Sequence, residues 1–228
     1  GGVPDADDTS GALLALRHLD HTNPDTLRAA SAGIRWLIAV QNRDGGVPTF
    51  CRGWGALPFD RSTPEITAHA FHAWSAWLPH MTPSGQGEIT RAASRALAFL
   101  AQNQRADGSW LPLWFGNEHT GDEENPTYGT AKVLAGLNSA GVDHPAIAQM
   151  NRRGVKWLAG AQNVDGGWGG ARGVSSSIEE TGVALSGLAA VAAKASADDL
   201  TEALVRGCDF LIDAAATAPD PAPIGLYF

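Results

Sequence analysis

The chain has 228 residues, a length at which a single domain can bury a sizeable core. Its residues are 44% hydrophobic and 18% charged, which is typical of globular rather than disordered proteins. The net charge of −8, without a basic patch, argues against a nucleic-acid partner, and no run of about 18 apolar residues could span a membrane. Cys51 and Cys208 form neither a disulfide framework nor a metal-ligand spacing, so a reducing, cytoplasmic location is expected.

The first predicted helix, which includes residues 11–16, follows an acidic segment, Asp5-Ala6-Asp7-Asp8-Thr9. Carboxylates this close together repel one another, so in a buried site at least one would hold its proton above its ordinary pKa. A neutral carboxylic acid is the group needed to protonate a carbon–carbon double bond. The competing interpretation is a solvated helix start in which Asp8 or Thr9 is the N-cap.

A segment with one fixed spacing recurs along the rest of the chain: an aromatic residue, an aliphatic residue, three residues, Gln, three residues and Gly. Its copies begin at Trp36, Phe99 and Trp157. A degenerate fourth copy begins at Arg206-Gly207 and runs through Phe210-Leu211, with Ala215 in place of Gln. Each copy lies in an Ala-rich stretch with helical spacing. Further helical stretches are predicted to open at Glu65, Tyr128 and Glu179 and to continue through 68–77, 131–137 and 182–193. Strand signals are absent, so the sequence predicts an all-α protein in which a helical hairpin is used about four times.

The Gln and Trp residues of the repeat have a structural interpretation. A Gln amide could bond the free N–H groups at the start of the next helix, while a Trp ring covers the turn. The residues concerned are Gln41, Gln104, Gln162, Trp110 and Trp168.

The string Gln162-Asn163-Val164-Asp165-Gly166-Gly167-Trp168 resembles the QW repeat of the triterpene cyclases, and Asp5-Ala6-Asp7-Asp8-Thr9 resembles their DxDD acid motif. Other stretches resemble this family in the same order: Ser62-Thr63-Pro64-Glu65-Ile66-Thr67-Ala68-His69, Asp107-Gly108-Ser109-Trp110, Tyr128-Gly129-Thr130 and Ile224-Gly225-Leu226-Tyr227-Phe228. The resemblance to squalene–hopene cyclases and other class II terpene cyclases covers nearly the whole chain. It implies an α/α toroid, of which about four hairpins of an incomplete α6/α6 barrel are present. Residues 1–228 are then expected to be a single domain, the C-terminal part of that barrel, truncated at the N-terminus and lacking a second, N-terminal barrel domain.

The resemblance also implies roles for individual residues. Asp7 matches the family's proton donor, flanked by Asp5 and Asp8, and His69 matches the histidine that holds and acidifies it. Glu65 stands where the family has an acid near this group. The aromatic positions of the cavity wall, which would stabilise a carbocation through ring faces, are matched by Phe50, Trp114, Tyr128 and Tyr227.

The implied activity is that of a class II, protonation-initiated polyene cyclase, an isomerase acting on squalene or a related polyisoprenoid without metal or cofactor. Two alternatives stay open: a diterpene cyclase acting on a prenyl diphosphate, and a non-catalytic toroid scaffold. The segment alone is expected to be inactive and to self-associate through an open apolar helix edge. The full-length enzyme is expected to dock peripherally on the inner membrane face.

One departure from the family pattern lies between Trp114 and Tyr128. Residues 115–127 are longer and more acidic than the family's link. The segment is interpreted either as a solvated insertion or as a cap over the cavity. Because it lies beside the expected cavity, the identity of the product stays open.

Overall fold

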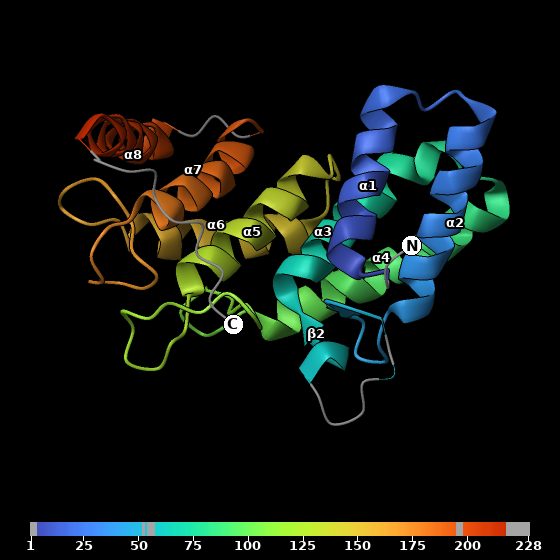
Figure 1. Ribbon diagram of the computed structural model, residues 1–228, viewed down its shortest axis with the longest axis horizontal. Coiled ribbons are helices and arrows are strands. Elements are labelled where there is room, and N and C mark those ends of the chain that lie inside the picture. The colour runs from blue at the N-terminus through green and yellow to red at the C-terminus, as the bar shows by residue number, and fades with distance from the viewer. Residues whose placement is uncertain (1–3, 52, 54–57, 195–197, 218–228) are drawn as a thin grey trace. The chain divides into compact units, whose positions relative to one another are not determined.

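The computed structural model describes residues 4–51, 53, 58–194 and 198–217. Most of these residues are helical, and long loops connect several of the helices (Figure 1). They divide into two compact units, Gly1–Asn103 with Ser139–Ala146, and Gln104–Asn138 with Ile147–Phe228. The all-α prediction is confirmed, although one short antiparallel pair of strands, β1 (Val47–Pro48) and β2 (Ser62–Thr63), was not expected because two residues carry no periodic signal.

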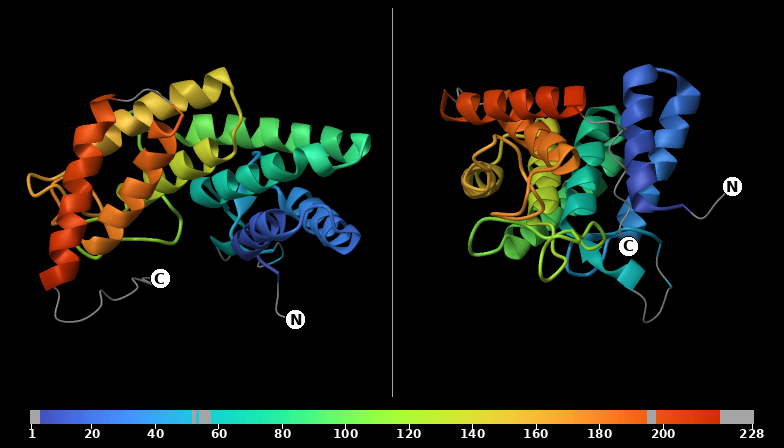
Figure 2. Two further views of the ribbon diagram at one scale, coloured as in Figure 1. Left: turned by 90° about the horizontal axis from the view of Figure 1, so that it is seen from above. Right: turned by 60° about the vertical axis from the view of Figure 1, so that its left-hand side comes forward.

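The first unit is built on two helical hairpins, α1 (Ala6–Leu19) with α2 (Pro24–Val40) and α3 (Pro64–Trp77) with α4 (Pro83–Asn103), with the short 3-10 turns η1 (Pro58–Asp60) and η2 (Leu78–His80). Helix α3 packs against both α1 and α4 (Figure 2). It supplies the fully buried rings of Phe71, Trp74 and Trp77 to the core. The indole N–H of Trp77 donates to the carbonyl of Leu13 at 2.7 Å, which ties α3 to α1.

The second unit contains the helices α7 (Ile178–Ala192) and α8 (Asp198–Thr217). It also contains α5 (Pro126–Ser139) except its last residue and α6 (Pro145–Ala159) except its first two. Leu134, Leu158, Trp168 and Leu188 are fully buried in its core. Helices α5 and α7 approach each other closely at Gly187, where a Cβ atom would lie 2.7 Å from the carbonyl oxygen of Ala131. A larger residue at this position would therefore push the two helices apart.

The Gln of each complete repeat copy connects its own turn to a helix later in the chain, α4, α6 or α8. In every case Nε2 donates to two carbonyls: Gln41 to Gly45 and Ala92 at 2.8 and 2.9 Å, Gln104 to Gly108 and Met150 at 2.9 and 3.0 Å, and Gln162 to Gly166 and Ala203 at 2.8 and 2.9 Å. The expected partners were N–H groups at a helix start. The structure corrects this, because the turn directs carbonyl oxygens toward the amide.

An Arg on the same later helix makes a second contact with the same turn. This Arg lies four residues before the aromatic residue of the following copy and donates to a backbone carbonyl of the turn. Arg95 donates to the carbonyl of Asn42, and Arg153 and Arg206 donate to Arg105 and Asn163 at 2.6 and 2.8 Å. We call each Gln–Arg connection a joint. The first copy has Ala32 where the Arg would stand, and the fourth has Ala215 where the Gln would stand.

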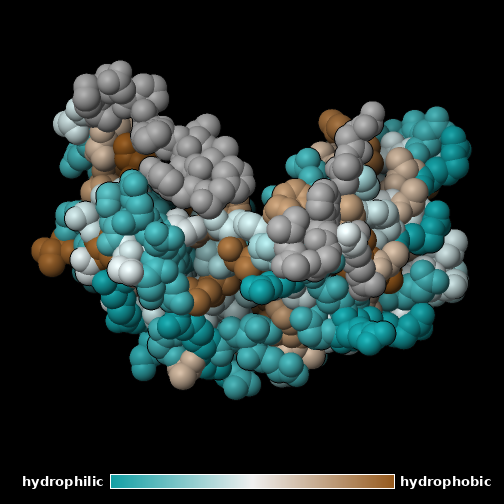
Figure 3. Space-filling view, turned by 60° about the horizontal axis from the view of Figure 1, so that its bottom comes forward, coloured by the Kyte–Doolittle hydropathy of each residue, from teal (hydrophilic) through white to brown (hydrophobic). Residues whose placement is uncertain are grey.

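The face seen in Figure 3 is mostly hydrophilic, and apolar side chains gather on it in small patches. Exposed large apolar residues include Leu19, Val164, Val205 and Ile212. The expected self-association stays a prediction. Among the described helices, none combines the length and the apolar character needed to cross a bilayer.

Candidate active site

The acidic segment forms the first turn of α1. Asp5 is the N-cap, and its Oδ1 accepts a hydrogen bond from the backbone N–H of Asp8 at 2.7 Å. The cap is therefore Asp5 rather than Asp8 or Thr9, because the helix begins at Ala6. This placement puts Asp7 and Asp8 within the first turn, where the partial positive charge of the helix start favours ionised carboxylates.

Asp7 meets His69 across the α1–α3 contact. The Asp7 Oδ1 and His69 Nδ1 atoms lie 2.7 Å apart, which is hydrogen-bond distance. Gly11, one turn along α1, leaves room for the imidazole, since a Cβ atom there would lie 3.8 Å from His69 Cε1. The two residues, 62 positions apart in the chain, can thus share one proton between carboxyl and imidazole.

The expectation that Asp7 is buried is not met. Its side chain is 53% exposed and that of His69 is 28% exposed. The described residues leave the first turn of α1 open to solvent on the side of Asp7. Exclusion of water from Asp7 therefore requires a segment other than those described.

The pKa of the Asp5 carboxyl is raised above its ordinary value of 3.8. Burial is the main cause, and the negative charges of Asp8 and Asp7 add to it. The hydrogen bond from the Asp8 backbone N–H opposes this shift and lowers the pKa of Asp5.

Two further predicted residues lie in the same unit. Glu65 is in the first turn of α3 and only 2% exposed. It precedes His69 by four residues, so both side chains lie on the same face of α3. Phe50 is half-buried and packs edge-to-face on Phe59, with ring centroids 5.1 Å apart.

The other aromatic candidates lie elsewhere. Trp114 and Tyr128 are half-buried residues of the second unit, and Tyr227 is outside the described residues. Phe115, which was not singled out from the sequence, stacks on Tyr128 with ring centroids 4.4 Å apart and an interplanar angle of 24°. The sequence signal that could have drawn attention to Phe115 is its position at the start of the 115–127 insertion.

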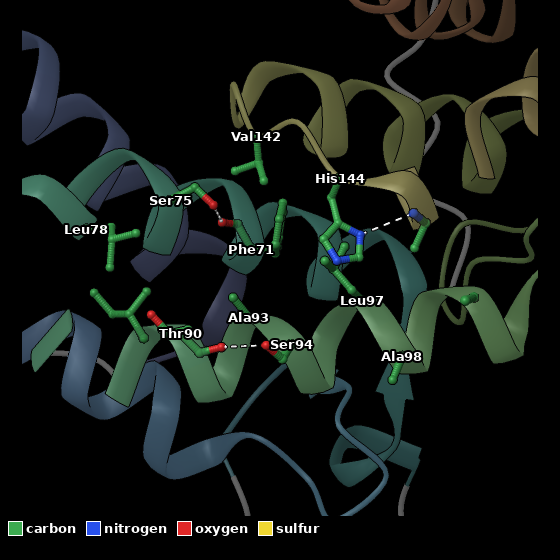
Figure 4. Close-up of a pocket in the computed structure, with 13 residues that line it drawn as sticks. Phe71, Ser75, Leu78, Thr90, Ala93, Ser94, Leu97, Ala98, Val142 and His144 are labelled. Carbon is green, nitrogen blue, oxygen red and sulfur yellow. Dashed lines mark hydrogen bonds between the residues drawn. The ribbon is translucent and has the colours of Figure 1, made fainter. Parts of the chain in front are cut away.

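A cavity of about 410 Å³ lies between α3, α4 and the segment leading into α6 (Figure 4). Its hydroxyl groups are turned to their own helices: Ser75 donates to Phe71 O at 2.8 Å and Ser94 to Thr90 O at 2.9 Å. The lining is therefore mainly apolar, and it contains none of the predicted site residues. Across the described residues, no three His, Cys, Asp or Glu side chains are grouped so that they could hold a metal ion.

The family model of the squalene-hopene cyclase C-terminal domain matches residues 2–219. The chain belongs to this family. It is 33% identical over 180 residues to a probable squalene–hopene cyclase of Sinorhizobium fredii, covering 73% of this chain and 25% of that protein. It is 31% identical over 184 residues to enfumafungin synthase of Hormonema carpetanum, covering 73% of this chain and 13% of that protein.

Among solved structures, ent-copalyl diphosphate synthase from Streptomyces platensis has a similar fold. The TM-score is 0.71 at 25% identity, over 98% of this chain and 37% of that one. The fold is thus the α/α helical-hairpin fold of the terpene cyclases, as predicted. The chain spans about a third or less of the length of these relatives.

Proposed function

We propose that this chain carries the acid of a class II terpene cyclase that protonates squalene or a related polyisoprenoid. Membership of a cyclase family supports the reaction class. The observation that carries the assignment is the 2.7 Å contact between Asp7 and His69, which pairs a carboxyl with a group able to hold its conjugate base. Asp5 and Asp8 add negative charge around Asp7 and disfavour its ionisation.

In this mechanism Asp7 transfers its proton to one carbon of a terminal double bond. The π electron pair forms the new C–H bond, and the other alkene carbon becomes a carbocation. The next double bonds attack this centre in turn, and loss of a proton or addition of water ends the cascade. The Asp7 carboxylate left behind accepts a hydrogen bond from His69, which strengthens the acid during transfer. The reaction needs no redox partner, because nothing is oxidised or reduced overall.

The carbocation must be kept from water until the rings have closed. Asp7 is 53% exposed in this chain, so we propose that another part of the full-length protein covers it, as a second barrel domain would. The greater length of the matched relatives is consistent with such a part. The aromatic residues Phe50, Trp114, Tyr128 and Tyr227 remain the proposed cavity wall. A squalene cyclase would take its substrate from a membrane, and we place it on the cytoplasmic face.

The test is Asp7→Asn in the full-length protein, supplied with squalene in detergent or vesicles. Cyclised product should fall at least about 10²-fold, the usual contribution of a general acid. The control is Asp20→Asn at the other end of α1, which removes a carboxylate remote from His69 and should retain activity. Unchanged product formation by Asp7→Asn would exclude Asp7 as the acid.

A second candidate, cyclisation of a prenyl diphosphate, is favoured by the similarity to an ent-copalyl diphosphate synthase. It is separated from the first by offering squalene and a prenyl diphosphate with Mg²⁺ in parallel. Product from the diphosphate alone would replace squalene as the substrate while keeping Asp7 as the acid. Absence of product from either substrate would favour a non-catalytic scaffold.

A further inference from the structure

Residues 5–8, here called the acid turn, are held by a backbone segment from elsewhere in the first unit. The N–H of Ala6 donates to the carbonyl of Thr49 at 2.9 Å. Ala6 is the first residue of α1, so this N–H is one of the donors that a helix start cannot pair within the helix. Ala6 is fully buried, so its N–H depends on this acceptor. The position of the acid turn is therefore tied to residues 47–49.

Thr67 of α3 holds the other end of residues 47–49. Its Oγ1 accepts from the N–H of Val47 at 2.8 Å and donates to the carbonyl of Thr63 at 2.7 Å. Thr67 and Val47 are both fully buried, so loss of this hydroxyl would leave the Val47 N–H inside the protein without that acceptor. One hydroxyl of α3 is thus connected to the acid turn through three residues of backbone.

This connection is separate from the contact between Asp7 and His69. Thr67 precedes His69 by two residues, and side chains at this spacing do not share a face of a helix. Helix α3 contacts both α1 and β1. The Thr67 hydroxyl bonds the segment that begins in β1, while the His69 imidazole meets Asp7 on α1. Residues 47–49 therefore join the two helices of the catalytic pair by a second route.

Two direct hydrogen bonds between α1 and α3 lie farther along α1. Trp77 Nε1 donates to the carbonyl of Leu13 at 2.7 Å, and Arg17 Nε donates to the carbonyl of Ala76 at 3.3 Å. Leu13 is six residues from Asp7, which is about 9 Å along a helix axis. These bonds fix the far part of α1, and the route through Thr67 fixes its start.

The second unit repeats this route without the acid. The N–H of Trp168 donates to Thr181 Oγ1 at 2.9 Å, and the N–H of Thr127 donates to the carbonyl of Gly170 at 3.1 Å. Residues 168–170 therefore join α7 to the start of α5, as residues 47–49 join α3 to the start of α1. The route is a scaffold contact of the repeat, and its copy in the first unit leads to the acid turn.

We propose that Thr67 is a positioning residue for the acid, acting through residues 47–49 and the Ala6 N–H to set the placement of Asp7 against His69. The inference rests on the proposed cyclase function and adds to it a residue outside the acid–histidine pair. A general acid works only from the productive geometry, and a displacement of about 1 Å can cost about 10²-fold in rate. Thr67 takes no part in the proton transfer itself, so its loss should lower kcat rather than raise KM.

The first experiment measures kcat and KM of full-length variants on the polyene that the wild type cyclises. Thr67→Val keeps the shape of the side chain without the hydroxyl, and kcat should fall about 10- to 100-fold while KM changes less than about threefold. Thr67→Ser keeps the hydroxyl and should hold kcat within about threefold of wild type.

The matched control is Thr181→Val, which removes the same buried hydrogen bond from the copy in the second unit. Its Tm should fall by about as much as that of Thr67→Val, because each variant leaves one buried N–H without its acceptor. Its kcat should stay within about twofold of wild type, because the route that it breaks leads to α5 and not to the acid turn. Equal losses of kcat in the two Thr→Val variants would overturn the positioning role.

Ala6→Pro cuts the same route at its other end and leaves α3 unaltered. Proline lacks the N–H and is tolerated at the first position of a helix. Asp5 already has the extended backbone that a following proline requires, with φ −122° and ψ 166°. The kcat of Ala6→Pro should fall by a similar factor to that of Thr67→Val. A wild-type kcat would contradict the route, and this result does not depend on whether Thr67→Val folds.

Amide hydrogen exchange of the same proteins tests the connection without substrate. Thr67→Val should raise exchange in residues 7–9 about tenfold or more, since loss of a buried contact promotes local opening, and Thr181→Val should leave these residues unchanged. If the wild type cyclises no polyene, the proposed function fails. Unchanged exchange in Thr67→Val overturns the connection in either case. If the wild type cyclises and exchange rises while kcat of Thr67→Val stays at the wild-type value, the positioning role is refuted and the cyclase stands.

Discussion

Replacing His69 by Ala should separate activity from stability. The 2.7 Å contact with Asp7 places His69 where it can hydrogen-bond the carboxylate formed on proton transfer. That bond is made to a full charge only after the proton has left, so it stabilises the transition state more than the ground state. In the proposed mechanism His69 acts through Asp7 as a positioning residue, and His69→Ala is then expected to lower the rate of cyclisation while leaving the protein folded.

The magnitude follows from the exposure of the pair. A hydrogen bond to a charged group contributes about 1.5–3 kcal/mol, which corresponds to a rate loss of about 10- to 150-fold. For folding, the side chains are 53% and 28% exposed, and a pair this open contributes only about 0–1 kcal/mol to stability. The variant should thus lose at least about ten times its rate with nearly unchanged unfolding free energy.

The assay measures kcat on the accepted polyene across pH, together with urea unfolding of the same samples. His72→Ala, one turn along α3, is the control and should alter kcat by less than about twofold, because general acid–base contributions require direct reach to the transferred proton. Two results would refute the reasoning. One is a rate equal to wild type, and the other is an unfolding free energy lowered by more than about 2 kcal/mol, beyond what such an exposed pair contributes.

The remaining predictions concern stability. Gln104→Ala leaves two carbonyl groups without their donor and should cost about 2–4 kcal/mol by urea unfolding, whereas the exposed Gln102→Ala should stay within about 0.5 kcal/mol; equal losses would contradict the joint. Gly187→Ala places a Cβ 2.7 Å from Ala131 O and should lower the free energy of unfolding by about 1–3 kcal/mol, seen as a lower Tm by calorimetry. An unchanged Tm would contradict the close approach of α5 and α7. Asp5→Asn retains an oxygen for the helix cap. Because the folded state raises the pKa of Asp5, this carboxyl stabilises the fold below its ordinary value of 3.8, and that contribution is lost as pH rises through the raised pKa. The stability of Asp5→Asn relative to wild type should therefore be greater at about pH 7 than at about pH 3, and the opposite order would show that burial does not control Asp5.

The helical hairpins could be predicted from sequence because their signals are local. Helical spacing and the turn glycines mark the helices, and the structure begins α3 and α5 within two residues of the predicted openings Glu65 and Tyr128, at Pro64 and Pro126. Proline suits the first turn of a helix, where its missing N–H has no partner to lose.

The candidate site depended more on resemblance than on pattern. The contact between Asp7 and His69 joins residues 62 positions apart, which no periodicity specifies. The exposure of Asp7 and the stacking of Phe115 on Tyr128 depend on which segments cover which surface, and composition does not report this. Glu180 did carry a local signal, the Ser-x-x-Glu spacing from the N-cap Ser177, but its partners Asn117 and Asn125 come from a loop more than fifty residues earlier.

The joints leave the links between hairpins free to diverge. Each joint connects a turn to a later helix. The residue pairs are Gln41 with Arg95 for α4, Gln104 with Arg153 for α6, and Gln162 with Arg206 for α8. None of these Gln and Arg residues belongs to the stretch between a turn and the helix that follows it. Phe50 lies in such a stretch before α3, and Phe115 lies in one before α5. Such a stretch can therefore change in length or in sequence while the joints keep their hydrogen bonds. The surface formed by these connecting segments is thus decoupled from the hydrogen bonds that hold the helices together.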